Sequence, residues 1–82
     1  MQRNDVVHLN DLAVGDIFYK LTDKHKAKLE VLIKETDRIT CVNPETMPQY
    51  RQNHYMHKYL KPETRVVFLR RSADAPAKTN AL

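Results

Sequence analysis

Alternating apolar and polar residues open the folded part of the chain. Gly15 and Asp16 form a turn signal, and Ile17, Tyr19 and Leu21 follow it at every second position. Side chains two residues apart point to the same face of a strand, so these three would share one side of it. The pattern therefore predicts a strand that starts directly after a turn.

A second alternation predicts a hairpin over residues 27–43. The segment 35–38 has the polar composition of a turn, and Ile39 and Cys41 would share one face of the returning strand. Pro44 ends this strand, because proline cannot donate a hydrogen bond to a ladder. In the first strand of this hairpin, Leu29, Val31 and Ile33 are expected on one face and Leu32 on the opposite face.

The last predicted strand covers residues 64–71 and is apolar on both faces. Val66 and Phe68 would lie on one face, with Val67 and Leu69 on the other. A strand of this kind is usually covered on both sides, so a neighbouring segment or a partner is expected over its second face.

Residues 46–60 fit two structures. In a strand, Tyr55, His57 and Tyr59 would alternate with the residues between them, whereas in a helix Tyr55 and Tyr59 would lie on one stripe that ends before Pro62. Asparagine, histidine and tyrosine are mediocre helix formers, which favours the strand. The alternative is an α+β chain with one helix at about 47–60.

Five short strands in a chain of 82 residues predict an all-β fold, a small five-stranded barrel. The run Leu12-Ala13-Val14-Gly15-Asp16-Ile17-Phe18, a basic loop, a meander, a turn at Tyr59-Leu60-Lys61-Pro62 and a closing Val66-Val67-Phe68-Leu69 resemble a barrel of the Src-homology-3 type. The opening run is similar to the first strand of many such barrels in transcription and translation proteins. We expect one domain over residues 5–71 and a disordered tail over residues 72–82.

Composition argues against several classes of protein. The chain has a single cysteine, so it cannot form an intrachain disulfide, and no apolar run approaches the length of a membrane span. No leader sequence is visible at the start, which together with the single thiol predicts a cytoplasmic protein without a membrane contact. One glycine is too few for a glycine-rich phosphate loop.

The residues that could carry catalysis or bind metal are poorly arranged for either. His54 and His57 would share a face only on a helix, and no second pair of ligands accompanies them. Cys41 would be buried in a strand, where a thiol is inert. The carboxylates are scattered and form no acid–base pair. The chain is therefore predicted to be no enzyme and to hold no metal or cofactor.

The net charge of +4 is concentrated in two basic blocks, within residues 20–34 and 51–71. In the second block, cations alternate with aromatic residues, and this pattern suits nucleic acid because rings stack on bases while cations hold phosphates. We expect the stretches 20–28 and 51–61 of these blocks to converge on one surface that binds nucleic acid or an assembly that processes it. The candidate residues are Lys24, Lys26, Lys28, Arg51, His54, Tyr55, His57, Lys58, Tyr59 and Lys61.

A protein partner is the alternative, because exposed tyrosine, methionine and arginine are common at the centres of protein interfaces. The chain would then be a small regulator or inhibitor of a partner enzyme, of the kind that phages and mobile elements encode. Leu32 and Val67, apolar on otherwise polar or doubtful faces, could mark a surface for a homodimer.

Overall fold

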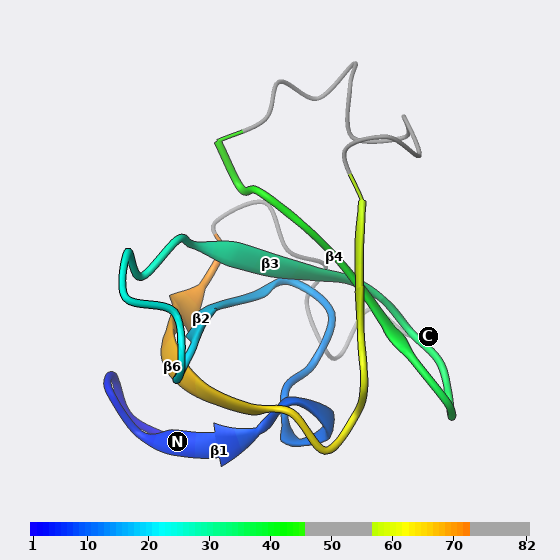
Figure 1. Cartoon of the computed structure of the whole chain (residues 1–82), viewed down its shortest axis with the longest axis horizontal. Coiled ribbons are helices and arrows are strands. Elements are labelled where there is room, and N and C mark those ends of the chain that lie inside the picture. The colour runs from blue at the N-terminus through cyan, green and yellow to red at the C-terminus, as the bar shows by residue number, and fades with distance from the viewer. Residues whose placement is uncertain (46–56, 73–82) are drawn as a thin grey trace.

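The computed structural model describes residues 1–45 and 57–72, and this part of the chain is all-β, as predicted. Its antiparallel strands form one sheet with the order β1-β6-β2-β3-β4-β5, curled into a half-barrel (Figure 1). Between β1 and β2 lies a single turn of 3-10 helix, η1. The elements are β1 (Val6–His8), η1 (Leu9–Asp11), β2 (Asp16–Lys20), β3 (Leu29–Lys34), β4 (Ile39–Val42), β5 (Lys58–Leu60) and β6 (Arg65–Arg71).

The described residues contain one strand more than the five expected from the sequence. β1 has only three residues and pairs with β6, where Val7 lies opposite Val66. So short a strand shows no periodicity of its own, and it forms because β6 offers a free edge. The last part of the ambiguous segment is the strand β5, while residues 46–56 lie outside the described residues.

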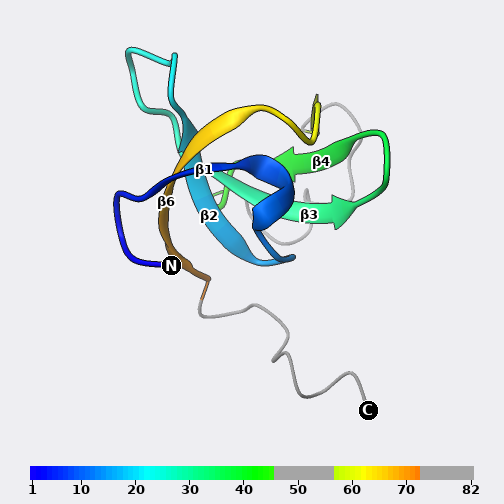
Figure 2. The same ribbon diagram turned by 90° about the horizontal axis from the view of Figure 1, so that it is seen from below.

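Ordered contacts extend slightly beyond the predicted domain, 5–71. The amide of Asn4 donates to the carbonyl of Phe68 at 2.7 Å, and the amide of Ser72 donates to the carbonyl of Gly15 at 2.8 Å. The predicted tail lies outside the described residues from position 73 onward. The amino-terminal residues thus add to the sheet edge beside β6, as Figure 2 shows from below.

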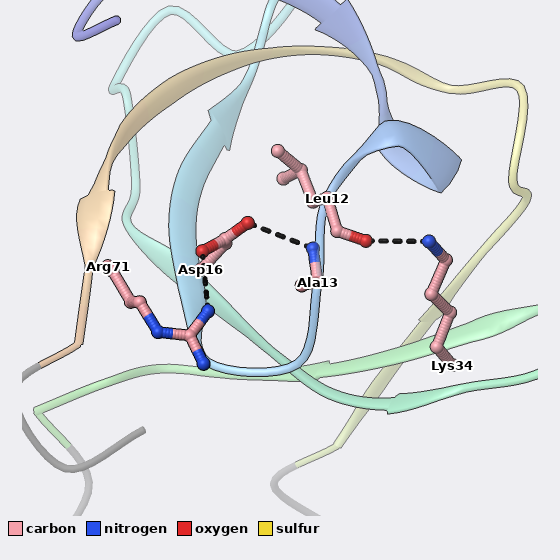
Figure 3. Close-up of polar contacts among 5 residues, drawn as sticks. All are labelled: Leu12, Ala13, Asp16, Lys34 and Arg71. Carbon is pink, nitrogen blue, oxygen red and sulfur yellow. Dashed lines mark hydrogen bonds and ion pairs between the residues drawn. The ribbon is translucent and has the colours of Figure 1, made fainter. Parts of the chain in front are cut away.

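A tight turn over residues 13–16 starts β2, as the sequence predicted. The amide of Asp16 donates to the carbonyl of Ala13 at 3.0 Å, and Gly15 has a φ of 96°. This positive φ is accessible to glycine because it has no Cβ. The carboxylate of Asp16 accepts from the amide of Ala13 at 2.9 Å and forms an ion pair with Arg71 at 3.4 Å (Figure 3). The turn is therefore tied to the end of β6.

Replacing Gly15 with valine should destabilise the fold by about 1–3 kcal/mol, because a β-branched residue is strained at positive φ. Gly15→Asn is the matched control, since asparagine has a similar size and tolerates this region. Chemical denaturation of both variants measures the difference. An equal loss of stability in both would show that side-chain volume, rather than φ, limits this buried position.

The core lies inside the curl of the sheet and centres on Phe18. Phe18 pairs with Leu29 on one side and with Phe68 on the other, so the three side chains share the inner face of the sheet. The buried cluster consists of Leu9, Leu12, Phe18, Leu29, Val31, Ile39, Cys41 and Val66, with Val7, Leu60 and Phe68 packed against it. Burial of Ile39 and Cys41 on one face confirms the predicted orientation of β4.

The predicted face of β3 is wrong at Ile33. Val31 lies opposite Cys41, but Ile33 lies opposite Thr40, so Leu32 is an extra residue that forms a bulge. A bulge shifts the alternation by one position, and Ile33 consequently faces outward and is exposed. Beyond the bulge, the inner position falls on Lys34, whose Nζ donates to the carbonyl of Leu12 at 2.7 Å (Figure 3). The same Nζ donates to the carbonyl of Asn10 at 2.6 Å.

Both faces of β6 are covered, as its sequence predicted. Val66 belongs to the inner cluster, whereas Val67 lies on the outer face between Val6 and Tyr19. Val67 is only 4% exposed, so its side chain is not part of an exposed apolar surface. Leu32, the other residue of the predicted homodimer surface, is half-buried. Leu69 is the extra residue of a second bulge, opposite the step from Ile17 to Phe18.

Candidate binding surfaces

Cys41 lies in the inner cluster and is fully buried. Burial raises the pKa of its thiol from the ordinary value of 9.0 to about 12, because the apolar core disfavours the thiolate. Its Sγ has one weak contact, with the carbonyl of Ile39 at 3.9 Å. The side chain therefore packs as a small apolar group, and its nucleophilic form is suppressed.

The loop between β2 and β3, residues 21–28, is organised by Asp23. Its two carboxylate oxygens accept from the amides of His25 and Ala27 at 2.9 and 3.2 Å. These hydrogen bonds lower the pKa of the Asp23 carboxyl, because they favour its charged form. The carbonyl of Asp23 also accepts from the amide of Lys26 at 3.2 Å. One acidic side chain thus holds the loop in a defined shape.

Three of the predicted site residues, Lys24, Lys26 and Lys28, are exposed on this β2–β3 loop. In the part of the chain that the structure describes, no acidic side chain pairs with any of them. Lys26 has a φ of 54°, and its Nζ lies 5.9 Å from the ring centre of Tyr19. The loop therefore presents three exposed lysines, against the one carboxylate of Asp23, beside a half-exposed aromatic ring.

A second surface surrounds Tyr59 on β5. Thr40 lies opposite Ile33 on one side and Tyr59 on the other, so the three side chains form a row on the outer face. Ile33 and Tyr59 are each 47% exposed, whereas Thr40 is buried between them. Arg38, from the β3–β4 turn, lies over the Tyr59 ring. We call the surface formed by these side chains the Tyr59 face; it consists of Ile33, Arg38 and Tyr59.

Contacts around the ring order this face. The Arg38 guanidinium carbon lies 4.8 Å from the ring centre of Tyr59, and its Nε donates to the Glu35 carboxylate at 2.9 Å. Glu35 raises the pKa of Arg38 through this hydrogen bond and its negative charge, so Arg38 stays protonated. The ring of His57 meets that of Tyr59 edge-on, with centres 6.5 Å apart and planes at 78°.

The predicted convergence of residues 20–28 with residues 51–61 is wrong for residues 57–61, the part of the second stretch that the structure describes. The two views place the β2–β3 loop and β5 on opposite sides of the molecule (Figures 1 and 2). In the curved sheet, β4 lies between β5 and β3, and the loop joins β3 to β2. The structure therefore forms two separate surfaces instead of one.

The remaining predicted site residues are neighbours of Tyr59 along the chain or lie outside the described residues. Lys58 and Lys61 are exposed on either side of Tyr59 along the chain, and His57 is half-buried against the ring. Arg51, His54 and Tyr55 lie outside the described residues. The sequence thus predicted which of these cations are exposed but not the separation of the loop lysines from β5.

Two residues with clear roles in these surfaces, Tyr19 and Arg38, were missed. Tyr19 was assigned to a strand face with Ile17, which is correct, but its contact with Lys26 depends on the path of the loop. Arg38 lies in the predicted turn, where its spacing of three residues from Glu35 was the available signal. The contact of Arg38 with Tyr59 joins residues from distant parts of the chain and has no local signature.

Comparisons with known proteins add no relative to these observations. No protein-family model, no curated protein and no solved structure matches the chain. In residues 1–45 and 57–72, no group of three histidine, cysteine or acidic residues could hold a metal ion. The same residues include no helix with the length and apolar character needed to cross a bilayer. The two surfaces are therefore interpreted from their own chemistry.

Proposed function

We propose that this chain is a non-enzymatic binding module that contacts nucleic acid, or an assembly that processes it, through the β2–β3 loop. The observation that carries the proposal is the group of exposed lysines, Lys24, Lys26 and Lys28, without acidic partners among the described residues. The buried, protonated Cys41 supports a role in binding rather than catalysis.

The positive charge of the β2–β3 loop and its ordered backbone both favour binding to nucleic acid. Each lysine that neutralises a phosphate releases condensed counterions, and this release drives binding to nucleic acid without sequence preference. The Asp23 carboxylate already orders the loop by accepting hydrogen bonds from backbone amides, so binding costs less conformational entropy than it would for a flexible loop. Exposed Arg65 adjoins the start of the loop, because its carbonyl accepts from the amide of Leu21 at 3.2 Å.

Salt dependence tests this proposal directly. A fluorescently labelled single strand of about twelve nucleotides, a size typical of small single-strand sites, serves as the probe. We expect fluorescence anisotropy to show binding at about 50 mM salt that weakens steeply towards about 200 mM. Absence of binding to single-stranded and duplex probes at the lower salt concentration would refute the proposed function.

Removing two loop charges should weaken binding and flatten its salt dependence. For the double variant Lys24→Gln/Lys28→Gln, the slope of log K against log salt should fall by about 1.4, at about 0.7 per lost contact with a single strand. The matched control is Arg3→Gln/Arg70→Gln, which removes the same charge from exposed positions outside the loop. Equal losses in both variants would assign binding to net charge alone.

A second candidate function is a regulator that docks on a protein, and the Tyr59 face favours it. Ile33 and Tyr59 are large and exposed and lie on one outer row, with the buried Thr40 between them. Tyrosine and arginine are frequent anchors at interfaces. Such an interface would respond weakly to salt. Co-precipitation from lysate with the wild type and with Tyr59→Ala tests this alternative. It fails if the variant retains every partner.

A further inference from the structure

The Tyr59 face contains a planar cation held in place from two sides. Arg38 comes from the β3–β4 turn and Tyr59 from β5, and pairing of Thr40 with Tyr59 brings the two elements together. The guanidinium carbon lies 4.8 Å from the ring centre, while Nε donates to Glu35 at 2.9 Å. The orientation of Arg38 is therefore set before any ligand arrives.

The two terminal nitrogens of Arg38 are the groups left for a ligand. Neither makes a hydrogen bond to the residues that the structure describes, and the side chain is 56% exposed. A guanidinium has planar donors that match phosphate geometry and a flat surface on which an unstacked base can lie. Because Arg38 already lies over the Tyr59 ring, a base would meet the guanidinium rather than the ring.

We propose that Arg38, supported by Tyr59, receives an unpaired base of a single-stranded nucleic acid and donates to the adjacent phosphate. This inference rests on the proposed nucleic-acid function and adds a second contact, on the side of the molecule opposite the β2–β3 loop. Exposed Ile33, on the same outer row as Tyr59 and across Thr40 from it, extends the apolar surface for a neighbouring sugar or base. Duplexes are excluded from this mode because their bases are already stacked.

The substitution Arg38→Lys separates stacking from charge, because lysine keeps the positive charge but lacks the planar surface. We expect it to weaken binding of a labelled oligothymidine of about twelve nucleotides at least fivefold, the lower bound for loss of one stacked base. Binding of a hairpin duplex of the same labelled type should stay unchanged. Arg70→Lys is the matched control, and thermal melts verify that both variants fold.

Loss of Tyr59 gives an independent readout at the same site. With Tyr59→Leu the guanidinium loses its aromatic support, and single-strand binding should weaken in the same direction as with Arg38→Lys. In the wild type, the nuclear magnetic resonance signal of the Arg38 Nε–H group should shift when oligothymidine is added and should not move with the duplex.

The outcomes separate this inference from the function on which it rests. If the wild type binds neither probe, the proposed function fails. If the wild type binds oligothymidine and Arg38→Lys binds it equally well, the stacking site is refuted while the loop function stands. Equal weakening of single-strand and duplex binding by Arg38→Lys would also refute stacking. Loss of a protein partner without loss of oligothymidine binding would assign the Tyr59 face to the protein-docking alternative.

Discussion

Replacing Phe18 with alanine should leave a large fraction of the chain unfolded at room temperature. Phe18 is the largest of the fully buried side chains and joins β2 to β3 and β6 on the inner face. Removing a buried phenylalanine costs about 3–5 kcal/mol, through lost burial and the cavity that remains. A domain this small lies at the lower end of the usual range of about 5–15 kcal/mol, so little stability would be left.

Circular dichroism during urea denaturation measures this effect. The control is Leu21→Ala, which removes an apolar side chain just beyond the same strand, at a position that is 44% exposed. Substitutions at such exposed positions usually change the free energy of unfolding by less than about 0.5 kcal/mol. If Phe18→Ala and Leu21→Ala had the same denaturation midpoint, the inner face of the curl would not be the core.

The second large effect concerns the reactivity of Cys41 towards alkylating agents. The pKa of its thiol is about 12, against an ordinary value of 9.0. At pH 8 this lowers the thiolate fraction about a thousandfold, because the fraction falls about tenfold for each unit by which the pKa rises. Since the thiolate is the nucleophile, we expect alkylation by iodoacetamide to be at least about a thousandfold slower in the folded chain than in urea. Mass spectrometry over time measures both rates.

The same shift in pKa predicts how Cys41 makes stability depend on pH. The folded state retains the thiol proton to higher pH than the unfolded state, so the contribution of the neutral thiol is complete below pH 9.0. As the pH rises from 9.0 through about 12, the unfolded chain loses its proton first and this contribution decreases. Cys41→Ser and the wild type should consequently differ in the slope of stability against pH above pH 9. Parallel slopes would contradict a raised pKa.

The candidate surfaces could be predicted only in part. Lys24, Lys26 and Lys28 were identified because a charged segment between two strands is expected in an exposed loop, and the structure places them there. Arg38 was missed because its importance comes from Tyr59, which is distant in sequence and reaches the turn only through pairing of β5 with β4. Spacing along the chain contains no information about such a contact.

Local chemistry was enough to determine the all-β class, the turn at Gly15 and the hairpin of β3 and β4. These features depend on residues that are neighbours in sequence: alternation defines a strand, and the positive φ of the turn requires a residue like glycine. The sequence also predicted that both faces of β6 would be covered, since Val66 and Val67 point in opposite directions.

Only the tertiary structure decided the register and the placement of the surfaces. The bulge at Leu32, which turns Ile33 outward and Lys34 inward, forms where β3 meets both β4 and the carbonyls of Asn10 and Leu12, within and just after η1. Curling of the sheet then separates the β2–β3 loop from β5. The periodicity of the sequence shows which residues alternate between the two faces of a strand. Long-range pairing decides which strands lie side by side, and this pairing sets the position of each surface.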